Sequence, residues 1–251
     1  MYGFISLLHK EVLRFAKVSL QTILAPIVTA LLYLLIFAHA LHPALPLYPG
    51  VDYRSFLIPG LVMMSMLQNT FANSSSSLIQ SKLLGNLIFV LLAPLSYRAF
   101  FSAYLFAAVL RGMLVGLGIL GVALWVGWPG IVHPLWVLGF SLLGCITFAI
   151  LGILAGIWAN KFEQLAGFQN FIIMPLTFLS GVFYSVESLP PFWKQLSYFN
   201  PVFYIVDGFR FGFFGIAETA PWLSLVVVLA HALGLTVLSL SVLKRGYRLR
   251  T

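Results

Sequence analysis

The sequence predicts an all-α polytopic membrane protein with six transmembrane helices, and two observations lead to this prediction. Of the 251 residues, 61% are hydrophobic and only 8% are charged, whereas soluble domains carry about 25% charged residues. So few charges cannot cover a surface that faces water, so lipid must surround the chain. Six apolar stretches also reach the ~20 residues that cross a bilayer core, at approximately 19–41, 55–77, 100–126, 135–158, 165–186 and 222–243.

Two further apolar stretches are not expected to span. Leu83 to Leu95 is too short, and Pro94 stops it, so we expect an interfacial or membrane-dipping helix there. Tyr198 to Ala217 is long enough, but Asp207 and Arg210 are costly in mid-bilayer, which favours re-entrant or interfacial structure on the outer side.

The distribution of charge predicts the orientation. With the N-terminus in the cytoplasm, four of the six acids fall outside, at Asp52, Glu187, Asp207 and Glu218. Ten of the fourteen Lys and Arg residues fall inside: Lys10, Arg14, Lys17, Lys82, Arg98, Lys161, Lys244, Arg245, Arg248 and Arg250. This is the positive-inside pattern, so both termini are expected in the cytoplasm. Topology thus explains the net charge of +8, and no nucleic-acid partner is expected.

The N-terminal segment 1–18 has helical periodicity. An apolar face is predicted from Ile5, Leu8, Val12 and Phe15, and a cationic face from Lys10, Arg14 and Lys17. Such a helix lies in the interface with its cations towards anionic headgroups. The alternative is a cytosolic extension of the first span.

No motif predicts catalysis, a cofactor or a metal site in this chain. There is no GxxxxGK[ST] loop, so ATP would have to bind a separate subunit. The histidines form no zinc-hydrolase pair, and Cys145 is expected to be a packing residue. The GxxxG pairs Gly112/Gly116 and Gly152/Gly156 predict close helix packing.

The second span has a polar face. Asn69, Asn73, Ser76 and Gln80 recur at i, i+4, i+7 and i+11. One interpretation is interhelical hydrogen bonding, and the other is a surface that lines a pathway or faces a dimer partner; the two overlap. Candidate partners are Gln169 and Asn170 of the fifth span, while Arg111 would snorkel or pair within the bundle.

Several motifs in order resemble a known family. Residues 175–185 read Pro-Leu-Thr-Phe-Leu-Ser-Gly-Val-Phe-Tyr-Ser, and Leu-Pro-Pro-Phe-Trp follows at 189–193. Asn200-Pro201, Tyr204 and Gly-Phe-Arg-Phe-Gly at 208–212 come next, and Phe-Leu-Ile-Pro-Gly-Leu occurs at 56–61 in the second span. Together they closely resemble ABC-2 type transporter permeases over nearly the whole chain.

The resemblance implies an architecture for the single domain 1–251. Six helices would follow an N-terminal interfacial helix (1–18), with a cytoplasmic coupling helix in the region 80–97 and outer re-entrant helices in 187–221. The coupling residues would be Lys82, Leu87, Phe89 and Pro94. Relatives commonly carry a Glu in the coupling helix, where this chain has Ile88 and Phe89. The outer gate would contain Pro190, Pro191, Asn200, Pro201, Asp207 and Arg210, with Asp207 and Arg210 spaced to pair.

The resemblance also implies a function. The chain would be the permease subunit of an exporter in the bacterial inner membrane, without catalytic activity of its own. It would act as a homodimer, or with a close paralogue, together with two subunits that bind ATP and Mg²⁺, and would move a lipid, glycan or drug-like substrate outward. The alternative is a secondary transporter or channel not coupled to ATP, but the six predicted spans hold no Asp or Glu for ion coupling.

Overall fold

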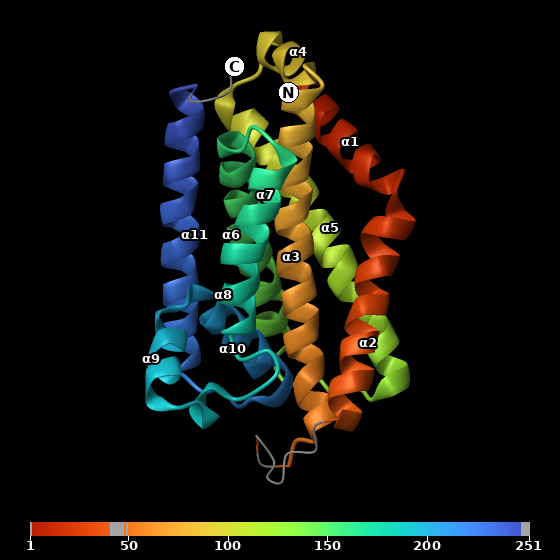
Figure 1. Cartoon of the computed structure of the whole chain (residues 1–251), viewed down its shortest axis with the longest axis vertical. Helices are drawn as coiled ribbons and strands as arrows, with labels where there is room; N and C mark the ends of the chain where they lie inside the picture. Colours follow the sequence, from red (N-terminus) through yellow and green to blue (C-terminus); the bar gives the residue numbers. More distant parts are fainter. Residues whose placement is uncertain (1, 41–47, 49, 247–251) are drawn as a thin grey trace.

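The computed structural model describes residues 2–40, 48 and 50–246. Within these residues the fold is helical, apart from one isolated bridge between Tyr48 and Val51. Long helices run side by side in one bundle, and short helices cover its two ends (Figure 1). The predicted all-α fold is therefore confirmed.

The helices follow one another along the chain with short connections. They are α1 (Tyr2–Ala16), the π-helix η1 (Leu20–Leu24), α2 (Ala25–Ala40), α3 (Tyr53–Leu83), α4 (Asn86–Leu92), α5 (Tyr97–Val126), α6 (Pro134–Trp158), α7 (Phe162–Phe168), the π-helix η2 (Gln169–Ile173), α8 (Met174–Phe178), the 3₁₀ turn η3 (Val186–Ser188), α9 (Pro191–Phe199), α10 (Pro201–Phe214) and α11 (Pro221–Lys244).

Among the described residues, five helices are long and apolar enough to cross a membrane. They cover Leu20–Phe37, Tyr53–Leu83, Tyr97–Trp125, Pro134–Trp158 and Pro221–Lys244. These match five of the six predicted spans. In α3, 78% of the most apolar window is buried, so α3 is the central helix. The corresponding share is 11% for Leu20–Phe37 and 17% for α11, so these two helices lie at the periphery of the bundle.

The predicted fifth span, 165–186, differs in the structure. Helix runs only from Phe162 to Phe178, with η2 in its middle, and turns follow. It ends there because Ser180 bonds the Thr177 carbonyl oxygen at 2.6 Å and Gly181 takes a positive φ of 76°. The segment still runs alongside α3 (Figure 1).

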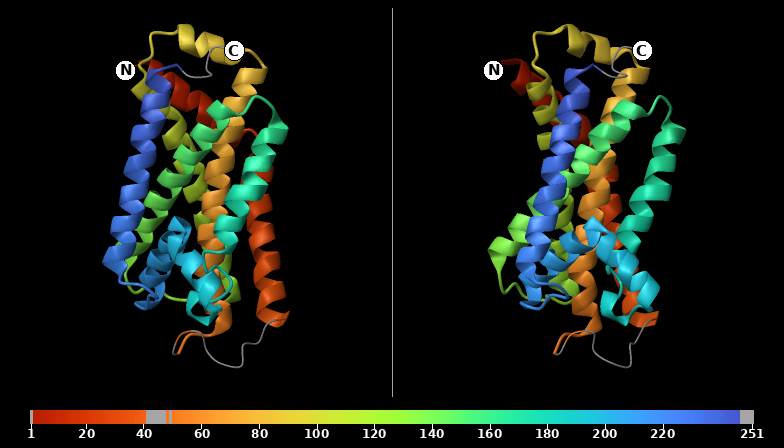
Figure 2. Two further views of the ribbon diagram at one scale, coloured as in Figure 1. Left: turned by 60° about the vertical axis from the view of Figure 1, so that its left-hand side comes forward. Right: turned by 90° about the vertical axis from the view of Figure 1, so that its left-hand side faces the viewer.

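The two ends of the bundle differ in content. The start of α1, the end of α11 and the whole of α4 lie at one end, here called the α4 end, whereas α9 and α10 lie at the opposite end (Figures 1 and 2). Arg248 and Arg250 of the predicted basic cluster lie outside the described residues. The shared position of α1 and the end of α11 agrees with the even number of crossings predicted from charge.

The face by which α1 packs was predicted incorrectly in part. Leu7, Glu11 and Phe15 are buried, at i, i+4 and i+8, whereas Ile5 is 54% exposed. The buried face is shifted because the carboxylate of Glu11 turns inward to Ser77 of α3. Packing of α1 against α5 is made by Leu7 with Phe100 and Tyr104.

Glycines let α5 and α6 approach α3 closely. A methyl group at Gly112 would overlap Thr70 Oγ1, and one at Gly116 would lie within 2.7 Å of Met66 Cγ. On α6, a Cβ at Gly152 would come 2.5 Å from the Phe71 carbonyl oxygen and one at Gly156 would come 2.8 Å from Leu78 Cβ. The predicted role of both GxxxG pairs in helix packing is confirmed.

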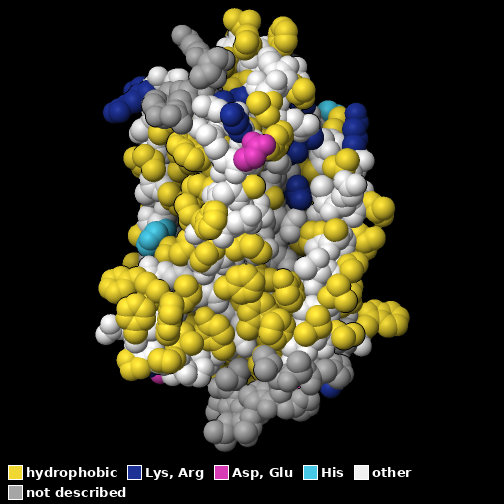
Figure 3. All heavy atoms as spheres, in the orientation of Figure 1, with side chains coloured by type: hydrophobic (Ala, Val, Ile, Leu, Met, Phe, Trp, Pro, Cys, Tyr) yellow, Lys and Arg dark blue, Asp and Glu magenta, His cyan; other side chains and the backbone are white. Residues whose placement is uncertain are grey.

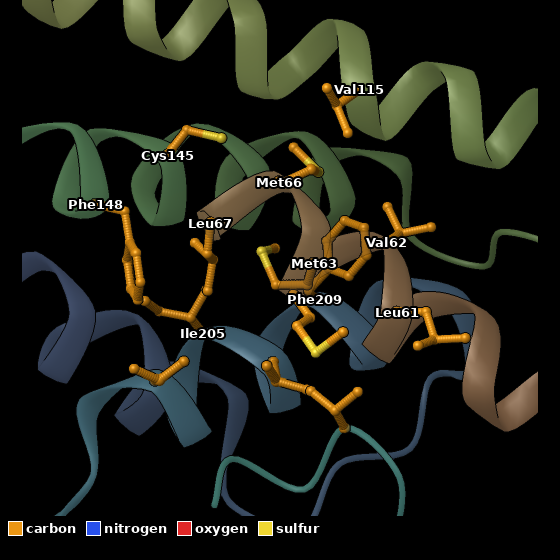
Figure 4. Close-up of a cluster of buried hydrophobic side chains, with 14 of the residues drawn as sticks. Leu61, Val62, Met63, Met66, Leu67, Val115, Cys145, Phe148, Ile205 and Phe209 are labelled. Carbon is orange, nitrogen blue, oxygen red and sulfur yellow. The ribbon is translucent and has the colours of Figure 1, made fainter. Parts of the chain in front are cut away.

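The main apolar core lies where α3, α5, α6 and α10 meet. Figure 4 shows Met63, Met66 and Leu67 of α3 among Cys145 of α6 and Phe209 of α10. Cys145 is fully buried in this cluster, so its predicted packing role is confirmed. This core holds α3 in place and leaves one side of that helix facing a groove.

Candidate functional site

A groove about halfway along the bundle lies between α2, α3 and α8. We call it the central groove; its volume is about 330 Å³. Its lining contains both polar and apolar groups and includes Gln21, Thr29, Tyr33, Ser65, Gln68, Asn69, Met174 and Phe178. A lining of this kind suits an amphiphilic molecule, because apolar walls hold its tail while a few amide and hydroxyl groups bind its polar part.

Both π-helical segments border the central groove. Gln21 belongs to η1, and Met174 directly follows η2. A π turn widens the helix by one residue and is frequent at functional sites. Irregular helix therefore contributes Gln21 to the groove directly, and η2 lies next to the lining residue Met174.

Asn73 joins three helices through two arginines. Arg14 of α1 donates from Nη2 to the Asn73 carbonyl oxygen at 2.9 Å and to Oδ1 at 2.8 Å. Arg111 of α5 donates from Nη1 to the same Oδ1 at 3.4 Å and from Nη2 to Asn69 Oδ1 at 3.0 Å. Asn73 is 1% exposed and Arg111 is 9% exposed, whereas the Arg14 side chain is 24% exposed. The bond from Arg111 to Asn73 is therefore buried, and Arg14 reaches Asn73 from a partly exposed position.

The predicted polar face of the second span therefore divides into two parts. Asn69 lines the central groove, whereas Asn73 faces α1 and α5. Ser76 is half-buried and donates to the Asn73 carbonyl oxygen at 3.4 Å. Gln169 and Asn170 were expected as partners, but the side-chain oxygens of Asn69 and Asn73 accept from arginines, and Asn69 Nδ2 donates to the Ser65 carbonyl oxygen at 3.0 Å. Gln169 is half-buried in η2 and Asn170 is exposed. The bond from α3 to the fifth span is instead made by Gln68 to Thr177, at 3.4 Å.

Glu11 is a buried residue that the sequence reasoning missed. Its carboxylate accepts from Ser77 Oγ and pairs with Lys10 at 3.4 Å and Arg14 at 3.3 Å. A signal was present, because Glu11 is the only acid among the first 51 residues and lies three residues before Arg14. An isolated acid within an apolar and basic segment has a charged partner nearby more often than not.

The short helix α4 has one buried face and one exposed face at the end of the bundle named after it. Gly85, with a φ of 72°, separates α3 from α4. Leu87 is buried in a satellite core with Leu7 and Phe100, whereas Phe89 is 73% and Leu92 is 77% exposed. The helix thus has one anchored face and one apolar face directed away from the bundle.

The other two predicted coupling residues, Lys82 and Pro94, lie just before and just after α4. Lys82 donates from Nζ to the carbonyl oxygens of Ile157 and Ala159, at 2.8 and 2.9 Å, so it caps the C-terminal end of α6. Pro94 is exposed in the turn before α5. That turn ends at Ser96, whose hydroxyl accepts from the Ala99 amide at 3.1 Å.

Prolines and Asn200 begin the helices at the opposite end of the bundle. Pro191 and Pro201 are the first residues of α9 and α10, and Pro190 precedes α9. Asn200 accepts from the Val202 amide at 3.0 Å and donates to the Leu176 carbonyl oxygen at 2.6 Å. It therefore caps α10 and ties it to α8.

Asp207 and Arg210 do not pair with each other, contrary to the prediction. Asp207 accepts from the amides of Glu218 and Thr219, at 2.8 and 3.1 Å. Arg210, 1% exposed, donates to the Gly181 carbonyl oxygen at 2.8 Å and lies 3.9 Å above the Phe56 ring. Each side chain satisfies backbone groups of a different loop, so both fasten α10 to its neighbours.

Two carboxyl groups at this end have opposite pKa shifts. Hydrogen bonds from Lys194 and then Tyr198 lower the pKa of Glu187, which is exposed. Burial raises the pKa of Glu218, and the nearby Arg210 only partly offsets this effect.

Comparisons with known proteins agree with this architecture. A family model described as ABC-2 type transporter matches residues 2–214. The chain is 34% identical over 247 residues to "Inner membrane transport permease YadH" of Escherichia coli K12, covering 98% of this chain and 96% of that protein. It is 26% identical over 210 residues to "Nodulation protein J" of Rhizobium meliloti, covering 83% and 80% of the two chains.

Proposed function

This chain belongs to the ABC-2 type transporter family, and from that membership we propose that it is the permease subunit of an ATP-driven exporter. It would work as a homodimer, or with a close paralogue, and with two subunits that bind and hydrolyse ATP with Mg²⁺. The cargo would be a lipid, a glycan or a drug-like molecule moved outward. The chain itself would carry no catalytic site.

The proposed topology has six crossings, with both termini in the cytoplasm. The sixth crossing would be α7–η2–α8, whose 17 residues reach about 26 Å at 1.5 Å per residue. The positive-inside rule supports this orientation, because Lys10, Lys82, Arg98 and Lys161 lie on segments of the α4 end, whereas Glu187 and Glu218 lie on segments of the other. The other end would then face outward, with α9 and α10 as a re-entrant gate.

The exposed apolar face of α4 is the observation that carries the coupling role. Phe89 and Leu92 are more exposed than most apolar side chains outside the spans, and they lie at the proposed cytoplasmic end. An apolar patch on that side needs a protein partner to exclude water. Since α4 follows α3 after one turn and its Leu87 and Val90 pack in one cluster with Leu7 of α1, an ATP-binding subunit docked there could move both helices.

The central groove supports the pathway role. It opens beside α2 and α8, and Gln68 and Asn69 give it polar groups at mid-membrane depth. Two copies that met along this side would enclose a polar path between them. Pathway and dimer contact would then involve the same face of α3.

The coupling role is tested by co-purification of the permease with its ATP-binding subunit. Phe89→Asp places a charge in the apolar contact, so we expect at least about a tenfold loss of bound subunit. Phe162→Asp is the matched control, because Phe162 is 50% exposed at the same end but lies outside α4. Equal recovery of the ATP-binding subunit with wild type and Phe89→Asp would contradict the coupling role.

A further inference from the structure

A second groove lies at the α4 end, between α1 and the end of α3. We call it the basic groove; its volume is about 630 Å³. It is lined by residues of the segment 6–18, which include His9, Lys10, Leu13, Arg14 and Lys17, and by Gln80 of α3. On this side of the molecule, Lys and Arg side chains gather near the α4 end, above a surface rich in hydrophobic side chains (Figure 3).

The charge of the basic groove is strongly unbalanced. Lys10, Arg14 and Lys17 line it, and none of its lining residues is acidic. The nearest carboxylate, Glu11, is 1% exposed; it bonds Ser77 in the interior and pairs with Lys10 and Arg14. One buried carboxylate against three cations leaves net positive charge directed into the groove.

Arg14 is held in place before any ligand arrives. Its Nε bonds Glu11 and its Nη2 bonds Asn73, so these bonds leave Nη1 on a guanidinium whose orientation is already fixed. A guanidinium and two ammonium groups around one cavity match the donors that bind phosphate oxygens. Little side-chain ordering would therefore accompany phosphate binding.

Apolar side chains adjoin these cations. Leu13 and Val18 line the basic groove and are 42% and 45% exposed, and Leu20, on the first turn of η1, is 73% exposed. A free anion would make no use of this surface, whereas an acyl or isoprenoid tail would cover it. The groove thus presents phosphate-binding and tail-binding surfaces side by side.

Polar side chains form a strip on α3 between the basic groove and the central groove. Gln80 lines the basic groove, Asn73 bonds Arg14, and Asn69 and Ser65 line the central groove. These positions are separated by seven, four and four residues, so they lie on one face of α3. Arg111, bonded to both Asn73 and Asn69, adds a positive charge along the strip.

We infer that the basic groove binds the phosphate group of an anionic amphiphile drawn from the leaflet at the α4 end. Its tail lies along Leu13, Val18 and Leu20. That this amphiphile is the cargo rests on the exporter function proposed above; its binding does not.

Binding is measured on the purified permease in uncharged detergent, without an ATP-binding subunit. The probes are dioctanoyl phosphatidylglycerol, dioctanoyl phosphatidylcholine with the same tails, and inorganic phosphate. We expect the anionic lipid to bind more tightly than either other probe. Since one cation near an anionic group contributes about a fivefold change in affinity, Lys10→Gln with Lys17→Gln should weaken its binding about 25-fold.

The matched control is Lys161→Gln with Lys244→Gln, which removes two exposed cations outside the groove. It should bind the anionic lipid as wild type does, and thermal unfolding checks that both double variants are folded. Equal binding of the two lipids, equal losses in the two double variants, or phosphate binding as tight as that of the anionic lipid would each overturn the inference.

The source of the amphiphile is read from molecules that co-purify with the permease. Mass spectrometry of wild type and of the Lys10/Lys17 double variant should show an anionic lipid lost only from the variant. A bilayer phospholipid or a different phosphate-bearing lipid would each support the site and identify its source. Because no ATP-binding subunit is present, failure here would leave the exporter function intact, and failure of the Phe89→Asp test would leave this binding intact.

Discussion

Arg14 and Asn73 lie 59 residues apart in sequence, yet the arginine donates to both the backbone and the side-chain oxygen of Asn73, at 2.9 and 2.8 Å. Their contact fastens α1 to the middle of α3. It also places a guanidinium between the residues that line the basic groove and those that line the central groove. The same contact therefore contributes to the packing of α3 and lies beside the residues proposed to take part in transport.

The first prediction concerns this pair. Asn73→Leu removes the side-chain oxygen that accepts from both Arg14 and Arg111. Each lost bond to a charged group costs about 1.5 kcal/mol, so we expect a loss of about 3 kcal/mol in unfolding free energy. Asn69→Leu removes one such bond and should cost about 1.5 kcal/mol. Asn73→Asp keeps the acceptor and should remain stable. Denaturant titration in detergent measures all three, and equal losses for the two Leu variants would count against the two-arginine arrangement.

The second prediction concerns the central groove. Gln68→Leu keeps a similar side-chain volume but removes a polar group from the lining of the groove. The hydrogen bond from Gln68 to Thr177 is long, at 3.4 Å, so its loss should change stability little. ATP turnover per assembled transporter should fall about tenfold, equivalent to ~1.4 kcal/mol, while abundance changes little. Thr147→Val is the control, since that hydroxyl bonds only within α6, to Leu143, and lies outside the groove. Unchanged turnover in Gln68→Leu would remove the central groove from the pathway.

The third prediction concerns orientation. Ser188 and Asn86 are exposed at opposite ends of the bundle, and the native Cys145 is buried. In intact cells, Ser188→Cys should react with a membrane-impermeant maleimide, and Asn86→Cys should react only after permeabilisation. The reverse pattern would place the termini outside.

The fourth prediction concerns pH. Burial raises the pKa of Glu218, so its ionised form destabilises the fold at neutral pH and this penalty disappears as pH falls through the raised pKa. Glu218→Gln should therefore have a higher Tm than wild type at neutral pH, with the difference shrinking on acidification.

Glu187→Gln is its counterpart. Lys194 and Tyr198 lower the pKa of Glu187, so its ionised form stabilises the fold above the unfolded pKa, and this contribution is lost as pH falls through the folded pKa. Its variant should have a Tm at or slightly below that of wild type at neutral pH, and the two should converge in acid. A higher Tm for both variants at neutral pH would contradict the opposite assignments.

Apolar length and glycine spacing predicted the bundle well, because each signal is contained within the sequence of one helix. Five predicted spans and the GxxxG contacts with α3 appear in the structure. The end of the fifth predicted span was wrong because it depends on a turn at Ser180 and Gly181 rather than on hydrophobicity.

Partners of polar side chains were harder to predict. Asp207 and Arg210 have ideal spacing for a pair, but each bonds a loop brought near by the tertiary fold. Asn73 and Arg14 likewise meet only after α1 has packed beside α3. Sequence spacing identifies neighbours on one helix but does not identify which residues of another helix will lie beside a polar side chain.

The two π-helical segments make the central groove sensitive to chain length. Removing one residue from Leu20–Leu24 would restore regular α-helical bonding. It would also rotate α2 by about 100° relative to α1, which would turn Thr29 and Tyr33 away from the groove. Among homologues, a one-residue alignment gap at η1 or η2 would therefore alter the groove more than many substitutions within it.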